Sequence, residues 1–199
     1  MTRLLLASQS AGRAQMLRDA GLDFDLEPAH LDETALIDGL LAEGQPARNI
    51  ADALAEAKAV KLSGRHPGQL VIGCDQILAL DDGSILAKPH GPADAEAQLA
   101  RLSGQRHRLW SAVVVAENSV PLWRHVGEAK MWVRPLSPAF ISAYVAAEWD
   151  RIRWTVGCYE VEGAGVQLFS RTEGDRWTII GLPMLALLDW LRGRGEVAA

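Results

Sequence analysis

The stretch LLLASQSAGR at residues 4–13 decides how the first part of the chain folds. It opens with an apolar run, Leu4-Leu5-Leu6-Ala7, that is typical of a short buried strand. Ser8 and Ser10 follow where a helix is predicted to begin, and Arg13 lies one turn further on. A helix N-terminus presents unpaired backbone N–H groups, so serine hydroxyls and a guanidinium there would complete an anion site. The alternative is that Ser10 only caps the helix and Arg13 lies in solvent.

Helical and strand patterns alternate along the rest of the chain. Apolar spacing predicts helices over residues 11–20, 46–63, 92–102, 138–148 and 182–191. Strands are expected over 70–74, 106–116 and 122–133, with a hairpin over 77–87 and two short strands around Gly163. Helices that alternate with apolar strands and are followed by longer paired strands indicate an α/β protein with a mixed sheet. We expect a single domain over residues 1–199.

Composition excludes several classes of protein. A hydrophobic content of 49% and a charged content of 23% are those of a soluble globular protein. No apolar run approaches the roughly 20 residues that a membrane helix needs, and no signal peptide is recognisable, so we expect a cytoplasmic protein without a membrane partner. The net charge of −5 argues against binding to nucleic acid polymers. Cys74 and Cys158 lack the spacing of a zinc site, and Cys74 is expected in the core.

Acidic residues stand at two places that suit catalysis. Asp75 follows the apolar run Leu70–Cys74 directly, and the carboxyl ends of strands line the ligand crevice of open α/β sheets. Asp75 can equally cap the next turn. Asp32 and Glu33 form an acidic pair that is either solvated surface or, beside a phosphate site, part of a metal site. Because Mg²⁺ takes one or two carboxylates plus phosphate oxygens and water, one acid of this pair with Asp75 would suffice.

Two lysines are candidate phosphate ligands. Lys58 lies in the predicted helix over 46–63, where a lone cation is ordinarily solvated. Lys88 precedes Pro89, whose ring fixes the direction of the chain. His107 begins a predicted strand, and we assign it a structural hydrogen bond rather than a catalytic role.

Together these segments resemble the Maf family of nucleoside triphosphate pyrophosphatases from Leu4 to about Leu191. The landmarks are LLLASQSAGR at 4–13, DE at 32–33, AEAK at 55–58, GCDQ at 73–76, AKP at 87–89, LSGQRH at 102–107 and GLP at 181–183. The resemblance implies an elongated, twisted mixed sheet flanked by helices, with two lobes around a central cleft. It also implies hydrolysis of a nucleoside triphosphate between the α and β phosphates, with a divalent cation, Mg²⁺ or Mn²⁺, as cofactor.

The resemblance assigns roles to individual residues. Asp75 is implied as the proton acceptor, and Glu33 assists it with the metal. The residues implied around the triphosphate are Ser8, Ser10, Arg13, Lys58 and Lys88. These roles agree with what attack of water on phosphorus needs, namely a base, a metal and cations that hold the leaving pyrophosphate. The oligomeric state is left open, and a homodimer is compatible with the chain.

The base of the nucleotide is indicated less directly. At two positions the chain resembles the branch of the family that prefers 7-methyl-GTP, because it carries Gln76 and Glu162. The branch that prefers pyrimidine nucleotides carries Thr and Gln at these positions. A buried carboxylate at 162 would accept the two donors of a guanine pairing edge, and Gln76, which sits beside Asp75, is expected to shape the same base pocket. However, that branch has an aromatic residue and two arginines after its second serine, whereas Ala11-Gly12-Arg13-Ala14 stands here.

Two other functions compete with this one. The inosine triphosphate pyrophosphatase group shares the architecture and reaction but has a phosphate motif different from ASQS. A nucleotide-binding regulator of cell division with little turnover is the alternative from another class, since residues 11, 12 and 14 depart from the family motif. Release of pyrophosphate from a panel of nucleoside triphosphates separates the three.

Overall fold

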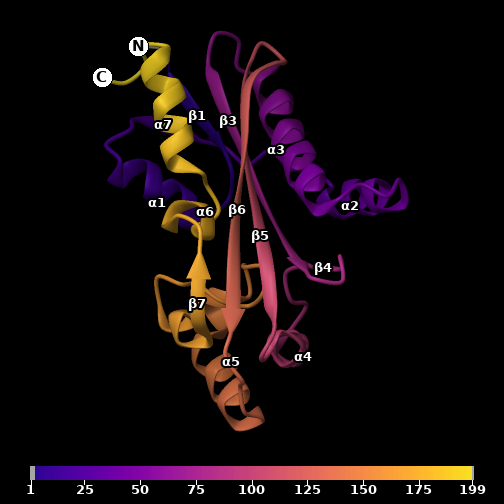
Figure 1. Ribbon diagram of the computed structural model, residues 1–199. Helices are drawn as coiled ribbons and strands as arrows, with labels where there is room; N and C mark the ends of the chain where they lie inside the picture. Colours follow the sequence, from indigo (N-terminus) through magenta and orange to yellow (C-terminus); the bar gives the residue numbers. More distant parts are fainter. Residues whose placement is uncertain (1–2, 199) are drawn as a thin grey trace. The chain divides into compact units, whose positions relative to one another are not determined.

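The computed structural model describes residues 3–198, which form a mixed seven-stranded sheet flanked by helices (Figure 1). The strand order is β2-β1-β3-β5-β6-β7, and β4 pairs with β3. The strands are β1 (Leu4–Ala7), β2 (Phe24–Leu26), β3 (Leu70–Leu80), β4 (Ile85–Leu86), β5 (Arg106–Glu117), β6 (Val120–Val133) and β7 (Phe169–Glu173). The helices are α1 (Ala11–Asp19), α2 (Glu33–Ala42), α3 (Ala47–Ser63), α4 (Pro92–Leu102), α5 (Pro138–Ile152), the 3₁₀-helix η1 (Ala164–Leu168), α6 (Arg176–Ile180) and α7 (Met184–Gly193). The mixed α/β class expected from the sequence is thereby confirmed.

The chain divides into two compact units. Unit 1 holds the described residues up to Gln76 together with Trp110–Gly127 and the residues from Asp175 onward. Unit 2 holds Ile77–Leu109 and Glu128–Gly174. Since β3, β5 and β6 contribute residues to both units, the division follows contacts rather than chain order. The central cleft and the single domain stay predictions.

In unit 1, helices cover both faces of a parallel three-stranded segment. β1 pairs in parallel with β2 and with β3. Because successive side chains of a strand point to opposite faces, Leu4 and Leu6 pack in one cluster with residues of α1 and α7. Leu5 and Ala7 pack in a second cluster with Leu62 of α3. Figure 1 accordingly shows α1, α6 and α7 on one side of these strands and α3 on the other.

Gly73 lets α3 lie directly against β3. A Cβ atom at this position would lie 2.1 Å from the carbonyl oxygen of Ala55 and 2.7 Å from the backbone nitrogen of Ala59. Both atoms belong to the backbone of α3, so no side-chain rotation relieves the clash. The glycine therefore fixes the spacing between the helix that carries Lys58 and the strand that carries Asp75.

We expect Gly73→Ala to lower the free energy of unfolding by about 2 kcal/mol or more, because α3 must move away from β3. Urea unfolding followed by circular dichroism measures the change. Gly91→Ala is the matched control, since a Cβ at Gly91 meets nothing within 4 Å. Equal stability of the two variants would contradict the close-approach role of Gly73.

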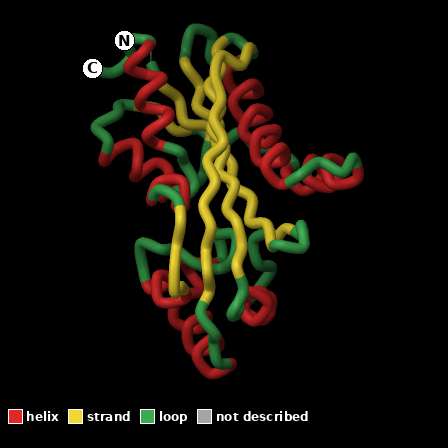
Figure 2. The backbone as a smooth tube through the Cα atoms, viewed as in Figure 1, coloured by secondary structure: helices red, strands yellow, loops and turns green. Residues whose placement is uncertain are grey.

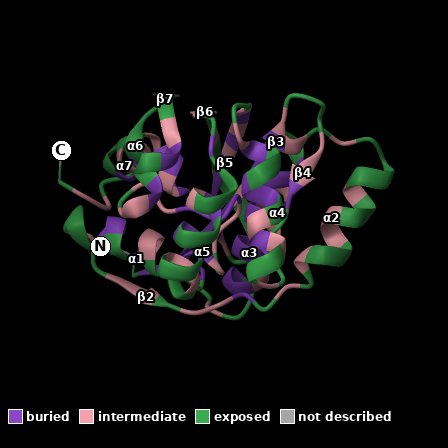
Figure 3. Cartoon of the chain, turned by 90° about the horizontal axis from the view of Figure 1, so that it is seen from below, coloured by how far each residue is buried: buried purple, intermediate pink, exposed green. Residues whose placement is uncertain are grey.

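Helix α2 was not predicted from the sequence. Asp32 caps it by accepting a hydrogen bond from the backbone nitrogen of Ala35 at 3.0 Å. A short loop joins α2 to α3, which it contacts (Figure 2). No residue of α2 is fully buried, whereas α3 buries one face, including Ile50 and Leu54 (Figure 3). The adjacent acids are thus a helix N-cap and a first-turn residue.

Unit 2 consists of antiparallel pairs covered by helices. β3 pairs with β4 as the predicted hairpin, and β6 pairs with β7, with Lys130 opposite Glu173. Helices α4 and α5 contact each other. His107 is fully buried, and its Nε2 lies 2.7 Å from the hydroxyl of Tyr159. Burial lowers the pKa of His107 to about 4, so the ring is neutral near pH 7, which agrees with the structural role assigned to it.

One expectation for the C-terminal part needs correction. In place of two short strands around Gly163, the chain forms η1 and then the single strand β7. The closing helix expected over 182–191 is present as α7, and a short helix that was not predicted, α6, precedes it, with Gly181 between them at a φ of 118°. Glycine adopts this conformation without a steric penalty, so the chain can turn there. Among the described residues, no helix is long and apolar enough to cross a membrane.

Candidate active site

The turn from β1 into α1 is held by its serines. Ser10 is the N-cap of α1, and its hydroxyl accepts a hydrogen bond from the backbone nitrogen of Arg13 at 3.3 Å. The hydroxyl of Ser8, which is buried, accepts one from the backbone nitrogen of Ser10 at 3.1 Å. The capping role weighed for Ser10 is therefore present in the structure. Binding of phosphate by the two serines stays a prediction.

Arg13 reaches across unit 1 instead of lying in solvent. Its Nε donates to the carbonyl oxygen of Gly181 at 2.9 Å, and its Nη1 donates to that of Cys74 at 3.1 Å. These bonds join α1 to the turn between α6 and α7 and to β3. A guanidinium carries five N–H donors, so two bonds to carbonyls leave three for a phosphate. The structure thus adds an organising role to the phosphate contact predicted for Arg13.

Three charged side chains of unit 1, those of Lys58, Asp75 and Glu33, lie in contact. The lysine Nζ contacts Oδ1 of Asp75 and lies 2.7 Å from Oε1 of Glu33. The lysine and aspartate side chains are only 10% and 9% exposed, while that of Glu33 is 41% exposed. Residues from α2, α3 and β3 therefore form a lysine-bridged pair of carboxylates, which we call the Lys58 cluster. The three residues that the sequence placed in one catalytic group are brought together.

The sequence suggested that the strand ends just before Asp75, but the structure shows otherwise. β3 continues through Asp75 to Leu80. The parallel neighbour β1, however, stops at Ala7, which pairs with Gly73. Asp75 therefore lies just past the end of β1, where a parallel strand no longer flanks it. Asp75 thus lies beyond the carboxyl end of a parallel strand, which is β1 and not β3, and its place in a ligand crevice stays a prediction.

The electrostatics of the cluster keep its lysine charged. Burial alone would lower the pKa of Lys58, but the attraction of Asp75 and Glu33 outweighs burial and the repulsion from Arg13, so the pKa is raised above its ordinary value. Lys58 therefore holds its proton near neutral pH. Its contact uses Oδ1 of Asp75, and in the described part of the chain no hydrogen bond engages Oδ2. A carboxylate oxygen in this state can accept a proton, which is the role predicted for Asp75.

The Lys58 cluster offers only its two carboxylates, those of Asp75 and Glu33, as ligands to a metal ion. Among residues 3–198, no group of three or more His, Cys, Asp or Glu side chains is placed to hold a metal ion. Asp75 and Glu33 nevertheless converge on one cation, the Lys58 ammonium. Mg²⁺ is typically bound by one or two carboxylates together with phosphate oxygens and water. The two acids therefore fit Mg²⁺ or Mn²⁺ that brings its remaining ligands with it.

Gln76 faces the opposite side of β3 from Asp75. Its Nε2 donates to Ser111 Oγ at 2.9 Å and to the carbonyl oxygens of Thr178 and Ile179 at 3.2 and 3.0 Å. Strand alternation accounts for this, because neighbouring residues of a strand point to opposite faces. The two neighbouring residues therefore face different surroundings, and the expectation that Gln76 shapes the base pocket stays a prediction. An influence of Gln76 on the substrate stays a prediction and would act through α6.

Sequence reasoning missed Ser111. Its hydroxyl is fully buried, accepts from Gln76 and donates to the carbonyl oxygen of Thr178 at 2.7 Å. Ser111 thus helps to hold the last turn of α6, next to the Gly181 carbonyl that binds Arg13. A signal was available, since Ser111 is the one hydroxyl residue in the run LWSAVVVA at 109–116. A buried hydroxyl needs a partner and often joins two elements.

Lys88 and Glu162 lie in unit 2, and both are exposed. The exposure of Glu162 overturns the expectation of a buried acceptor for the base. The cause is local, because residues 161–163 form a turn before η1 instead of a strand in the sheet. The contacts of Lys88 and Glu162 with a nucleotide stay predictions.

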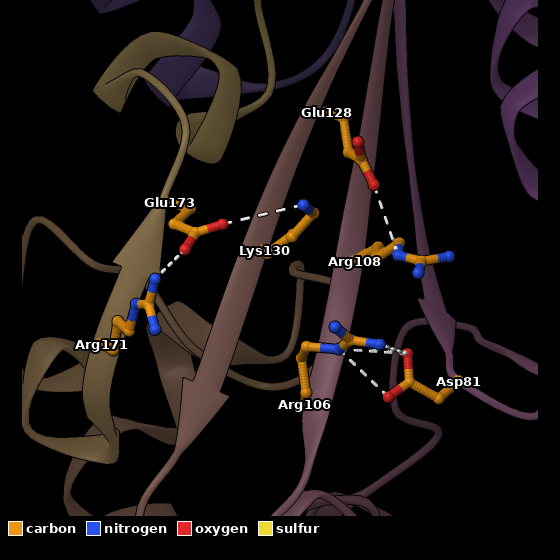
Figure 4. Close-up of polar contacts among 7 residues, drawn as sticks. All are labelled: Asp81, Arg106, Arg108, Glu128, Lys130, Arg171 and Glu173. Atoms are coloured by element: carbon orange, nitrogen blue, oxygen red, sulfur yellow. Dashed lines mark hydrogen bonds and ion pairs between the residues drawn. The ribbon is translucent and has the colours of Figure 1, made fainter.

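A charged network covers part of the sheet in unit 2 (Figure 4). Arg106 binds Asp81 through both Nε and Nη2, with the closest contact at 2.8 Å. The other residues drawn, Arg108, Glu128, Lys130, Arg171 and Glu173, form further ion pairs between or within strands. Four cations thus face three carboxylates, which gives strands β5–β7 a mixed surface. Solvent-exposed pairs of this kind add little stability each.

Two acids bound to a buried lysine, together with an arginine at a strand-to-helix turn, match what phosphoryl transfer requires of a protein. The model of the family described as Maf-like protein matches residues 3–194. The chain belongs to the Maf family.

Curated relatives cover nearly the whole chain. A protein of Sphingopyxis alaskensis named nucleoside triphosphate pyrophosphatase is 65% identical over 96% of this chain and 97% of its own length. One of Ruegeria pomeroyi with the same name is 49% identical over 98% of this chain and 97% of its own length. A protein of Brucella abortus named 7-methyl-GTP pyrophosphatase is 45% identical over 96% of this chain and 95% of its own length.

Proposed function

We propose that this protein hydrolyses a nucleoside triphosphate to a monophosphate and pyrophosphate. The observation that carries the proposal is the Lys58 cluster, which places a carboxylate with one unengaged oxygen beside a charged lysine. Water attacks the α phosphorus while Asp75 takes its proton, and the bond from that phosphorus to the bridging oxygen breaks, so pyrophosphate leaves. The names of the relatives support this reaction.

Each described residue of the site has a part in this reaction. Asp75 orients the water and accepts its proton, and Lys58 holds phosphate oxygens as their negative charge grows. Glu33 and Asp75 would hold the divalent cation, which neutralises charge on the phosphates. Arg13 contributes its remaining N–H donors to the phosphate chain. Ser8, Ser10 and Lys88 are proposed as further phosphate ligands.

The decisive experiment follows the oxygen of water. Purified protein is incubated in ¹⁸O-labelled water with Mg²⁺ or Mn²⁺ and, in separate reactions, UTP, ITP, GTP or 7-methyl-GTP. We expect monophosphate and pyrophosphate in equal amounts, with the label in the monophosphate. Release of inorganic phosphate and a diphosphate would contradict the reaction. Tight nucleotide binding without pyrophosphate release would favour the alternative, a nucleotide-binding regulator.

For the base, we propose 7-methyl-GTP or another modified nucleotide, which would make the protein a house-cleaning enzyme. The name of the Brucella abortus relative supports this choice, as does the pair Gln76 and Glu162. Since Glu162 is exposed in the ligand-free protein, it can read a base only if the bound nucleotide covers it. Guanine-type bases would therefore be selected through contacts that Glu162 makes only when the nucleotide is bound.

We expect Glu162→Gln to lower the ratio of kcat/KM for 7-methyl-GTP to that for UTP by about tenfold, because one acceptor becomes a donor. Steady-state kinetics with both substrates measure the ratio. Glu96→Gln, on helix α4 of the same unit, is the control and should leave it unchanged. An unaltered ratio in Glu162→Gln would show that this residue does not read the base.

A further inference from the structure

Lys58 already occupies one oxygen of each of the two carboxylates that fit a divalent cation. Its Nζ contacts Oδ1 of Asp75 and lies 2.7 Å from Oε1 of Glu33. A metal ion that bound the same two acids would therefore lie beside the buried ammonium, and the two positive charges would repel each other. This inference rests on the proposed function. We propose that the substrate is the metal–nucleotide complex and that Lys58 excludes free metal from the two acids. The phosphates of the nucleotide then draw the lysine ammonium away from the acids, and the metal can bind.

The charges of the ligand-free cluster support this order of binding. The two carboxylates are balanced by Lys58 and by Arg13, which is close enough to repel the lysine. A free divalent cation would thus enter a region without net negative charge and would meet a buried ammonium at short range. Repulsion between charges is strong where water is excluded. The phosphates of a nucleotide remove this obstacle, since they supply negative charge to both the metal and the lysine.

The shortage of protein ligands points the same way. No third acidic, histidine or cysteine side chain joins the two carboxylates within the described ranges. Mg²⁺ gives up its water reluctantly and is usually held by one or two carboxylates plus substrate phosphates. Oxygens of the triphosphate complete the coordination only when the nucleotide is present. Metal and nucleotide therefore bind together.

The lysine is able to make the exchange. α3 is a helix of 17 residues whose inner face packs in the core, so its backbone is held in place. The four-carbon stem of a lysine is flexible, and its ammonium presents three donors that need no fixed plane. A swing of the side chain alone can transfer the ammonium from carboxylate to phosphate oxygens.

The test measures binding of Mn²⁺ to the nucleotide-free full-length protein, by the electron paramagnetic resonance signal of the free ion. We expect weak binding to the wild type and binding at least about tenfold tighter to Lys58→Met, which removes the charge and keeps the side-chain length. Lys58→Arg should bind as weakly as the wild type. Lys61→Met is the control on the same helix, because Lys61 donates to the carbonyl oxygen of His30 and touches neither acid. Equal affinity of wild type and Lys58→Met would overturn the proposal.

A second measurement needs no variant and applies even if Lys58→Met fails to fold. The ¹⁵N resonance of the Lys58 ammonium is recorded with Mg²⁺ alone, and then with Mg²⁺ and inorganic tripolyphosphate, which carries the phosphate chain without a base. We expect no change with Mg²⁺ alone and a shift when both are present. A full shift with Mg²⁺ alone would overturn the exchange.

Pyrophosphate release by the wild type is measured in parallel and separates the two proposals. If the wild type releases pyrophosphate but binds Mn²⁺ as tightly as Lys58→Met, the exclusion of metal by Lys58 is wrong and the hydrolase stands. If Lys58→Met binds Mn²⁺ more tightly and no nucleotide is hydrolysed, the exclusion stands and the proposed reaction is wrong.

Discussion

Asp75→Asn is expected to lower kcat by about 10²- to 10⁴-fold, which corresponds to about 3 to 5 kcal/mol of transition-state stabilisation. Asparagine keeps the shape of the side chain, and its carbonyl oxygen can still accept a hydrogen bond from Lys58, but it cannot take a proton from water. Because the side chains proposed to bind phosphate are unchanged, and the carbonyl oxygen of asparagine can still ligate the cation that Asp75 would hold, KM should stay within a few-fold of the wild type. Pyrophosphate release at saturating substrate measures the effect.

Asp81→Asn is the control for this change. Asp81 lies just past the end of β3, in the turn, and binds Arg106; both residues belong to unit 2, whereas the Lys58 cluster belongs to unit 1. We expect its kcat to stay within about twofold of the wild type, since an exposed ion pair contributes little. An Asp75→Asn protein that keeps half of the wild-type turnover would remove Asp75 from the role of base.

Much of the fold follows from local sequence signals. The apolar run at 70–74 predicted a buried strand, and α4 begins at Pro92 and ends at Leu102, as its spacing indicated. These signals succeed because they record burial, which is the largest favourable contribution to folding. The ends are less well determined. The strand predicted over 70–74 and the first strand of the hairpin predicted over 77–87 form one continuous strand, β3, because Asp75 and Gln76 between them do not interrupt it.

Helix α2 was missed although its signals were present. Asp32 is an N-cap residue, and Leu36, Ile37, Leu40 and Leu41 recur at helical spacing. The acidic pair was instead weighed only as surface or as a metal site. The structure gives the pair two further roles, since Asp32 caps the helix while Glu33, one residue later, binds Lys58, and a metal site at the pair stays a prediction.

The site could be assembled only in part from the residues. Strand position alone singled out Asp75, whereas the meeting of Lys58 with Asp75 depends on how α3 packs on β3 at Gly73. That packing joins residues distant in sequence, so the family resemblance, and not the local pattern, brought the three together. That Gln76 and Asp75 point to opposite faces of β3 follows from strand alternation, because the two residues are neighbours in the strand. The exposure of Glu162 was not derivable, since the turn before η1 has no periodic pattern.

Arg13→Ala is expected to lower kcat/KM by at least about 100-fold, because one charged phosphate ligand is lost and its remaining partners shift. It should also lower the free energy of unfolding by about 1 to 3 kcal/mol, since the carbonyl oxygens of Gly181 and Cys74 lose a charged donor. Arg13→Lys keeps the charge but cannot span both carbonyls, so it should recover only a small part of either loss.

Arg18→Ala, on the same helix, is the control for the loss of an arginine, since Arg18 is exposed and lies over the ring of Phe24. It should change kcat/KM by less than about twofold. Two measurements separate the roles of Arg13: urea unfolding reports the bonds to the carbonyls, and equilibrium binding of tripolyphosphate reports the phosphate contact. If Arg13→Ala is destabilised but binds tripolyphosphate as tightly as the wild type, Arg13 positions the turn between α6 and α7 and does not bind phosphate.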